Sequence, residues 1–105
     1  MASVMIGIPA RNEARFIGQT LDSVLAQDFT DWNLLVSDNA STDGTDQIVR
    51  EYAARDRRIR LDRVSTAVSQ VENFNRLAGG VSAPYFVWLG GHDRWAPSFL
   101  SCCLD

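Results

Sequence analysis

The sequence predicts a Rossmann-like α/β fold, in which helices cover both faces of a mainly parallel sheet. Apolar, β-branched runs alternate with amphipathic segments in the order β-α-β-α-β-α-β. The segments between the strands are long enough for the crossovers that parallel pairing requires. The third strand has polar residues at half of its positions, which is typical of a sheet edge. With right-handed crossovers, these observations predict a three-layer sandwich with the strand order 3-2-1-4.

The first strand and the first helix are predicted from residues 4–25. Residues 4–8 are almost continuously apolar, which fits a strand buried on both faces. Pro9 is expected to end this strand, because proline cannot donate to a central ladder. Asn12 and Glu13 are expected to open a helix. Its inner face is predicted from four apolar residues at helical spacing: Ile17, Leu21, Val24 and Leu25.

A second strand and a second helix are predicted next. The strand is expected from Trp32 to Ser37, and the helix should end at the cationic run Arg55 to Arg58, where the helix dipole favours positive charge. The inner face of this helix is predicted from four residues: Ile48, Val49, Tyr52 and Ala53. Residues 59–64 form the predicted edge strand.

The last third of the chain predicts one more helix and one more strand. Ser69 and Glu72 have the spacing of a capping box, and Gly79-Gly80 should stop the helix. Its inner face is predicted from four residues: Val71, Phe74, Leu77 and Ala78. Residues 85–89 are strongly aromatic and apolar and predict the fourth strand. A short helical segment is expected over residues 97–104.

The composition bounds the classes of function. The chain has 105 residues, 46% of them hydrophobic, and a net charge of −3, which suits a single domain over residues 1–105. This mild acidity gives no reason to propose nucleic acid or an anionic membrane as a partner. Cys102 and Cys103 are adjacent and supply neither a disulfide framework nor a metal site, so we expect a cytoplasmic location. The apolar stretch at the start is too short for a signal peptide or a membrane span.

Polar clusters follow three of the four predicted strands. Residues 9–13 follow the first strand, Asp38 and Asn39 end the second, and His92 and Asp93 come after the fourth. Each cluster alone is equally well explained as a turn or a helix cap. Because the carboxyl ends of parallel strands meet at one edge of the sheet, the three clusters together predict a ligand crevice there.

The absence of several known motifs argues against some classes of ligand and of protein. No G-x-G-x-x-G sequence follows the first strand, so the dinucleotide fingerprint is absent, and there is no Walker phosphate loop. A receiver domain of a phosphorelay would need an acidic pair after the first strand and an aspartate after the third. The chain has Asn12-Glu13 and Arg63-Val64-Ser65 at these places, which argues against that class.

Four motifs in the expected order resemble the family 2 glycosyltransferases, enzymes of the GT-A fold that use nucleotide-diphosphate sugars. The matching segments are Ile8-Pro9-Ala10-Arg11-Asn12-Glu13, residues 21–27 (LDSVLAQ), residues 36–45 (VSDNASTDGT) and residues 85–93 (YFVWLGGHD). The resemblance runs over nearly the whole chain. It covers only the N-terminal, nucleotide-binding half of a typical member, so it implies a fragment of a longer glycosyltransferase.

The resemblance implies a role for each matching residue. Pro9, Ala10 and Arg11 would flank the nucleoside, Glu13 would hold the ribose or the base region, and Asp38 would hydrogen-bond the base, commonly uracil. Asn39 stands where many relatives have a second aspartate. His92 and Asp93 would hold the diphosphate and a divalent cation. These eight positions are the candidate site.

The metal motif departs from the family pattern. The family carries Asp-x-Asp, often with a further aspartate, whereas this chain reads Gly90-Gly91-His92-Asp93. Imidazole suits Mn²⁺ better than Mg²⁺, so Mn²⁺ is favoured if a cation binds. His92 could also contact phosphate when protonated, or belong to a glycine turn without a catalytic duty. Lesser candidates are Arg11 and Arg94 for contact with the diphosphate, and either Asn73 or Asn75 for contact with the nucleotide.

Two hypotheses follow. The first is the donor-binding half of an inverting glycosyltransferase that transfers a sugar, with UDP-sugars favoured, to a hydroxyl of a carbohydrate or lipid-linked acceptor. The catalytic residues then remain unassigned, because the family's general base lies beyond residue 105, and the full-length form could sit at the inner face of the membrane in making cell-envelope polysaccharide. The alternative is a non-catalytic nucleotide-sugar or protein-binding module with a degenerate metal motif. A half domain would also leave apolar surface uncovered, which predicts self-association to a homo-oligomer.

Overall fold

The computed structural model describes residues 3–79 and 83–104 and contains one four-stranded sheet. Its strands are β1 (Val4–Ala10), β2 (Trp32–Asn39), β3 (Ile59–Val64) and β4 (Tyr85–Trp88). All neighbouring pairs are parallel, and the order across the sheet is β3-β2-β1-β4. The predicted strand order and the predicted edge position of residues 59–64 are therefore confirmed.

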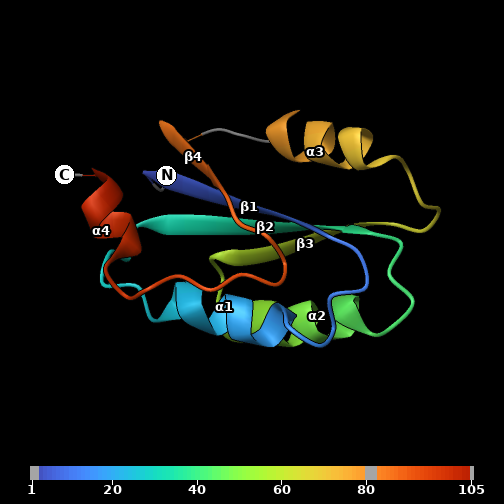
Figure 1. Cartoon of the computed structure of the whole chain (residues 1–105), viewed down its shortest axis with the longest axis horizontal. Helices are drawn as coiled ribbons and strands as arrows, with labels where there is room; N and C mark the ends of the chain where they lie inside the picture. Colours follow the sequence, from blue (N-terminus) through green and yellow to red (C-terminus); the bar gives the residue numbers. More distant parts are fainter. Residues whose placement is uncertain (1–2, 80–82, 105) are drawn as a thin grey trace.

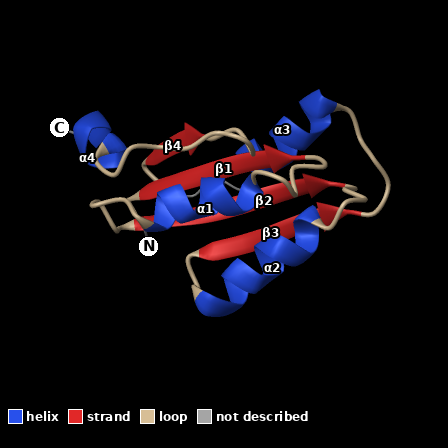
Figure 2. Ribbon diagram, turned by 60° about the horizontal axis from the view of Figure 1, so that its bottom comes forward, coloured by secondary structure: helices blue, strands red, loops and turns tan. Residues whose placement is uncertain are grey.

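Helices cover both faces of this sheet (Figure 1). They are α1 (Ile17–Leu25), α2 (Thr45–Arg55), α3 (Gln70–Gly79) and α4 (Phe99–Leu104). α1 and α2 lie together under one face, and α3 lies on the opposite face, so the predicted three layers are present. Figure 2 shows the strand arrows pointing to one edge, while the short α4 sits at the opposite edge. Across the described ranges 3–79 and 83–104, no helix combines the length and the apolar content that a bilayer crossing needs.

The core is built from the side chains that the central strands place between the layers. Ile6, Ile8, Leu34 and Val36 are each fully buried, because β1 and β2 have a neighbour on both sides and helices above and below. Burial of such side chains contributes roughly 1.5–3 kcal/mol each to folding. The two central strands therefore form a rigid base for the loops at their carboxyl ends.

Pro9 does not end the first strand as expected. β1 continues to Ala10, with Pro9 opposite Ser37 and Ala10 opposite Asp38. The carbonyl of Gly7 accepts a hydrogen bond from the backbone N–H of Leu89, so Gly7 faces the β4 side of the strand. Pro9, two residues on, faces the same side, where pairing with β4 has already stopped. The missing N–H of Pro9 therefore costs no ladder bond.

The first helix begins later than predicted. α1 starts at Ile17, not at Asn12 and Glu13. Asn12 adopts a left-handed backbone conformation (φ 54°), which a right-handed helix cannot contain. The carbonyl of Glu13 accepts from the backbone N–H of Phe16 and of Ile17, so a turn precedes the helix. At the other end, Leu25 is 38% exposed and does not belong to the inner face.

The third helix has a partly different inner face from the one predicted. Asn73 and Leu77 are buried, whereas Val71 is 68% exposed and Ala78 is exposed. The predicted cap is present, because the N–H of Glu72 donates to Ser69 Oγ at 3.1 Å. The helix ends at Gly79 as expected, and Gly80 lies outside the described residues. β4 ends at Trp88, one residue earlier than predicted.

Candidate functional site

The carboxyl ends of β1, β2 and β3 lie side by side in register. Ala10 pairs with Asp38, and Asp38 pairs with Arg63. The loops that leave these strands therefore start from neighbouring points of one sheet edge (Figure 2). This is the edge at which open α/β sheets bind ligands.

The loops after β1 and β2 are joined to each other by hydrogen bonds. The N–H of Asn12 donates to Ser41 Oγ at 2.8 Å, and Asn12 Oδ1 accepts from the N–H of Thr42 at 2.8 Å. The N–H of Glu13 donates to Thr45 Oγ1 at 2.9 Å. Each bond satisfies a loop N–H that has no helical partner. The conformation of residues 12–13 is thus set by residues about thirty positions away.

Asp43 completes this junction. Its carboxylate accepts from the N–H of Ala14 at 3.1 Å and from the N–H of Thr45 at 3.1 Å, next to the first turn of α2. Desolvation of the carboxylate would by itself raise the pKa of Asp43. The hydrogen bonds from Thr45 and Ala14 outweigh this effect and hold the pKa below its usual value. Asp43 therefore acts as an ionised cap that links the two loops.

Asp38 lies on the α2 side of the sheet. It is fully buried, accepts a hydrogen bond from the Ser41 hydroxyl, and is paired with Arg63, whose Nε lies 3.1 Å from Asp38 Oδ2. Arg63 Nη2 also donates to the carbonyl of Ser41 at 3.1 Å, and Arg63 Nε lies 3.7 Å from Asp46 Oδ2 of α2. Asp38 therefore holds the loop after β2 in place.

Ser37 and Asn39 point to the opposite face, toward α3. Side chains alternate along a strand, so the neighbours of Asp38 face the other way. The Ser37 hydroxyl donates to Asn73 Oδ1 at 2.6 Å, and Asn73 Nδ2 donates to the carbonyl of Ser37 at 3.1 Å. Asn39 Nδ2 donates to the carbonyl of Val68 at 2.8 Å, and the backbone N–H of Val68 donates to Asn39 Oδ1 at 2.9 Å. Two pairs of hydrogen bonds thus connect the end of β2 to α3 and to the segment just before it.

A pocket of about 500 Å³ opens between these elements. This volume is within the range of small-molecule sites. The loops after β1 and β4, the end of β2 and the first turns of α3 form its walls. The lining residues are Pro9, Ala10, Arg11, Glu13, Asn39, Val68, Gln70, Asn73, Phe74, Gly90, Gly91 and His92.

The loop after β4 closes the pocket beside Glu13. A Cβ atom at Gly91 would lie 2.9 Å from Glu13 Cγ, so a larger residue at position 91 would force the side chain of Glu13 to shift. His92 Nδ1 lies 3.5 Å from Glu13 Oε1. Asp93 turns back toward Gly90, and a Cβ atom at Gly90 would lie 2.5 Å from Asp93 Oδ2. The carboxylate of Asp93 thus occupies space that a longer residue at position 90 would need.

The donor atoms of this loop do not complete a metal site by themselves. Within residues 3–79 and 83–104, no group of three or more histidine, cysteine, aspartate or glutamate side chains is arranged to hold an ion. His92 and Asp93 would need further oxygen ligands, from water or from a bound ligand, to hold a divalent cation, as is common for Mg²⁺ at phosphates.

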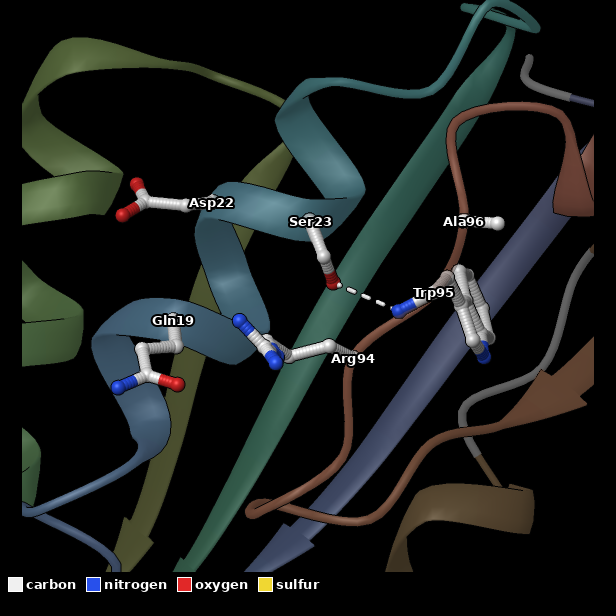
Figure 3. A pocket seen from close by; sticks show the side chains of 6 residues that line it. All are labelled: Gln19, Asp22, Ser23, Arg94, Trp95 and Ala96. Atoms are coloured by element: carbon white, nitrogen blue, oxygen red, sulfur yellow. Dashed lines mark hydrogen bonds between the residues drawn. The ribbon is translucent and has the colours of Figure 1, made fainter.

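A second hollow, of about 560 Å³, lies on the other face of the sheet, between α1 and the segment that follows the pocket loop (Figure 3). Ser23 Oγ accepts from the backbone N–H of Trp95 at 3.2 Å, and Arg94 lies near Gln19. The carboxylate of Asp22 points away from these groups toward α2. The polar side chains of this hollow therefore do not converge on one point.

Six of the eight predicted site residues line the pocket: Pro9, Ala10, Arg11, Glu13, Asn39 and His92. Asp38 and Asp93 are not among its lining residues. Of the lesser candidates, Arg11 and Asn73 line the pocket, Asn75 is exposed, and Arg94 lines the second hollow. Sequence reasoning missed three lining residues, namely Val68, Gln70 and Phe74. A polar residue at an inner position of α3, such as Asn73, is the signal that could have pointed to this wall.

The fold and the pocket together define the class of the protein: a Rossmann-like α/β domain with a pocket at the carboxyl edge of its parallel sheet. Comparison with known proteins gives the family. The Glycosyl transferase family 2 model matches residues 5–105. The chain belongs to glycosyltransferase family 2, as the four motifs implied.

Known proteins of similar sequence or structure extend this result. EpsE of Bacillus subtilis (strain 168) is 33% identical over 96 residues, which are 90% of this chain and 34% of EpsE. The mannosyltransferase PcManGT from Pyrobaculum calidifontis, solved in complex with GDP-Man and Mn²⁺, has a TM-score of 0.86 at 26% identity and is matched over 98% of this chain and 31% of its own. TarS 1–349 of S. aureus, solved in complex with UDP, has a TM-score of 0.89 at 21% identity, with coverage of 97% and 31%. The chain thus spans about a third of the length of these proteins.

Proposed function

We propose that the chain is the donor-binding part of an inverting glycosyltransferase, and that the pocket between the β1 loop and α3 holds the nucleoside of a nucleotide-diphosphate sugar, with UDP-sugars favoured. The observation that carries this proposal is the position of the pocket. It lies at the carboxyl edge of a family 2 sheet and is lined by six of the eight residues that the family motifs single out.

The chemistry of the lining supports a nucleotide. Phe74 and Pro9 offer apolar contact to a base, and Glu13 and Gln70 offer polar groups for a ribose or a base edge. Arg11 is exposed at the rim, where a guanidinium can form charge-assisted hydrogen bonds with a diphosphate. Asp38 would then support the base site indirectly, through the loop that it holds.

The metal and the transfer step belong to the same proposal. Asp93 and His92 would share a divalent cation with the diphosphate, Mn²⁺ being favoured, and the cation would stabilise the negative charge of the departing nucleoside diphosphate. PcManGT was solved with Mn²⁺. Inversion would require an acceptor hydroxyl and a general base on the face opposite the leaving group. The acceptor, the cytoplasmic location and the cell-envelope role stay predictions.

The test is calorimetric titration of UDP, GDP and TDP into the purified chain, with and without Mn²⁺. We expect saturable binding of UDP that strengthens with Mn²⁺. Arg11→Ala should weaken it about tenfold, because a hydrogen bond to a charged group contributes roughly 1.5–3 kcal/mol. Arg57→Ala, which removes the same charge from an exposed position near the end of α2, should leave it unchanged. A folded chain that binds none of the three nucleotides would contradict the proposal.

The non-catalytic module is kept as a second candidate because of one observation: the chain reads Gly90-Gly91-His92-Asp93 where the family carries Asp-x-Asp. This candidate predicts that UDP binds equally well with and without Mn²⁺, and that Asp93→Ala does not change the affinity. The donor-site proposal predicts that Asp93→Ala abolishes the Mn²⁺ effect.

A further inference from the structure

One wall of the pocket is a short segment without regular structure, residues 66–69, between β3 and α3. Val68 and the following Gln70 line the pocket, whereas Thr66, Ala67 and Ser69 are exposed. Ser69 caps the helix that follows. The segment therefore has little burial of its own to fix its distance from the sheet.

Asn39 supplies the hydrogen bonds that fix this segment. Its amide pairs with both backbone groups of Val68, at 2.8 Å and 2.9 Å. In the described part of the chain, residues 66–68 form no other hydrogen bond with a different element. Asn39 is itself only 6% exposed, at the end of a central strand. A rigid strand thus holds an otherwise free segment through one side chain.

The pairing requires an amide. The N–H of Val68 can only donate and its carbonyl can only accept, so the side chain opposite must present one acceptor and one donor. A carboxylate at position 39 would place an oxygen against the carbonyl oxygen of Val68 at hydrogen-bond distance. This contact would be repulsive, and the two groups would have to separate. Asparagine at this position therefore differs from aspartate in more than charge.

We propose that Asn39 is a positioning residue that holds residues 66–69 against the end of β2 and so sets the width of the pocket on the α3 side. The consequence for ligands rests on the proposed function. The fixed position of Val68 would limit the size of the nucleoside that fits the pocket. Both polar atoms of the Asn39 side chain are hydrogen-bonded to Val68.

The test uses Asn39→Asp and Asn39→Leu, with Asn75→Asp as the matched control. Asn39→Asp replaces the hydrogen bond to the Val68 carbonyl with a repulsive contact between two oxygens. Asn39→Leu removes both hydrogen bonds and keeps a similar side-chain volume. Asn75 is exposed on α3, so Asn75→Asp makes the same chemical change away from the segment. Circular dichroism of each variant establishes that it is folded.

The first measurement is ¹⁵N relaxation of the backbone. Order parameters at residues 66–69 should fall from about 0.85 to below about 0.6 in both Asn39 variants. They should stay unchanged at Leu34, in the centre of the sheet, and everywhere in Asn75→Asp. A purely stabilising role would lower the unfolding midpoint without this local loss of order. Unchanged order parameters at residues 66–69 in both variants would overturn the proposal.

The second measurement is the affinity for UDP, GDP and TDP. We expect the dissociation constant of the nucleotide that the wild type binds to rise about tenfold in both Asn39 variants, the change that a loss of about 1.4 kcal/mol produces. Local loss of order with unchanged affinity would overturn the link between the wall and the ligand. If the wild type binds none of the three, the proposed function fails, while the relaxation data still decide whether Asn39 holds the segment.

Discussion

The three polar residues at the end of β2 point alternately to the two faces of the sheet. Ser37 and Asn39 face α3, and Asn39 lines the pocket, whereas Asp38 faces α2 and is fully buried against Ser41 and Arg63. This division follows from the alternation of side chains along a strand. Adjacent residues of one motif can therefore have different roles, and Asp38 is expected to matter mainly for stability.

We predict that Asp38→Ala lowers the free energy of unfolding by about 1–3 kcal/mol, because it removes the buried carboxylate to which the Ser41 hydroxyl and Arg63 Nε donate. Asp62→Ala is the control, since Asp62 also pairs with an arginine, Arg76, at 2.6 Å, but is 49% exposed. An exposed pair contributes less than about 1 kcal/mol. Urea denaturation of both variants measures the difference. Equal losses would show that burial of Asp38 does not decide its contribution.

The regular elements differ in how far the sequence determines them. The strands and their order could be predicted, because continuous apolar runs and one polar edge strand are local features. The start of α1 could not, because the conformation of Asn12 and Glu13 depends on bonds to Ser41 and Thr45, which lie in another loop. The same limit applies to the site. The loops at the strand ends were predicted from topology, but the wall at Val68 depends on a pairing that no local pattern indicates.

The loop after β4 offers a test of the altered metal motif. We predict that Gly90→Asp strengthens Mn²⁺ binding by more than tenfold. The closest contact of the new side chain is with the flexible end of Asp93, which can rotate away, and two carboxylates would then share one turn. A unit charge about 4 Å from a divalent cation contributes about 2 kcal/mol even at the dielectric constant of water.

The control is Gly79→Asp, at the end of α3, where an added Cβ meets nothing within 4 Å. It adds the same charge away from the loop and should leave Mn²⁺ binding unchanged. Calorimetric titration with Mn²⁺ measures both variants. A gain that is equal in the two would mean that net charge, and not the geometry of the loop, attracts the cation.

The two edges of the whole sheet have opposite character. β3 exposes Arg60, Asp62 and Arg63, and such charged residues oppose pairing with another chain. β4 exposes Tyr85 and Trp88, which are 58% and 44% accessible. In the described part of the chain β4 pairs only with β1, so its outer side is an unpaired strand edge beside exposed aromatic side chains. If the self-association predicted from the sequence occurs, it should use this edge.

We therefore predict that the chain associates with a second copy through β4 in a concentration-dependent way, and that Tyr85→Lys weakens this association at least about tenfold. A lysine at an exposed edge adds charge that must be desolvated when two edges meet. Leu25→Lys is the control, because Leu25 is 38% exposed on α1, away from that edge. Sedimentation velocity over a range of concentrations measures all three proteins. If Leu25→Lys weakened association as much as Tyr85→Lys, general surface charge would explain the effect. If the wild type stayed monomeric throughout, the exposed aromatic edge would not be sufficient for pairing, and the self-association predicted from the sequence would be wrong.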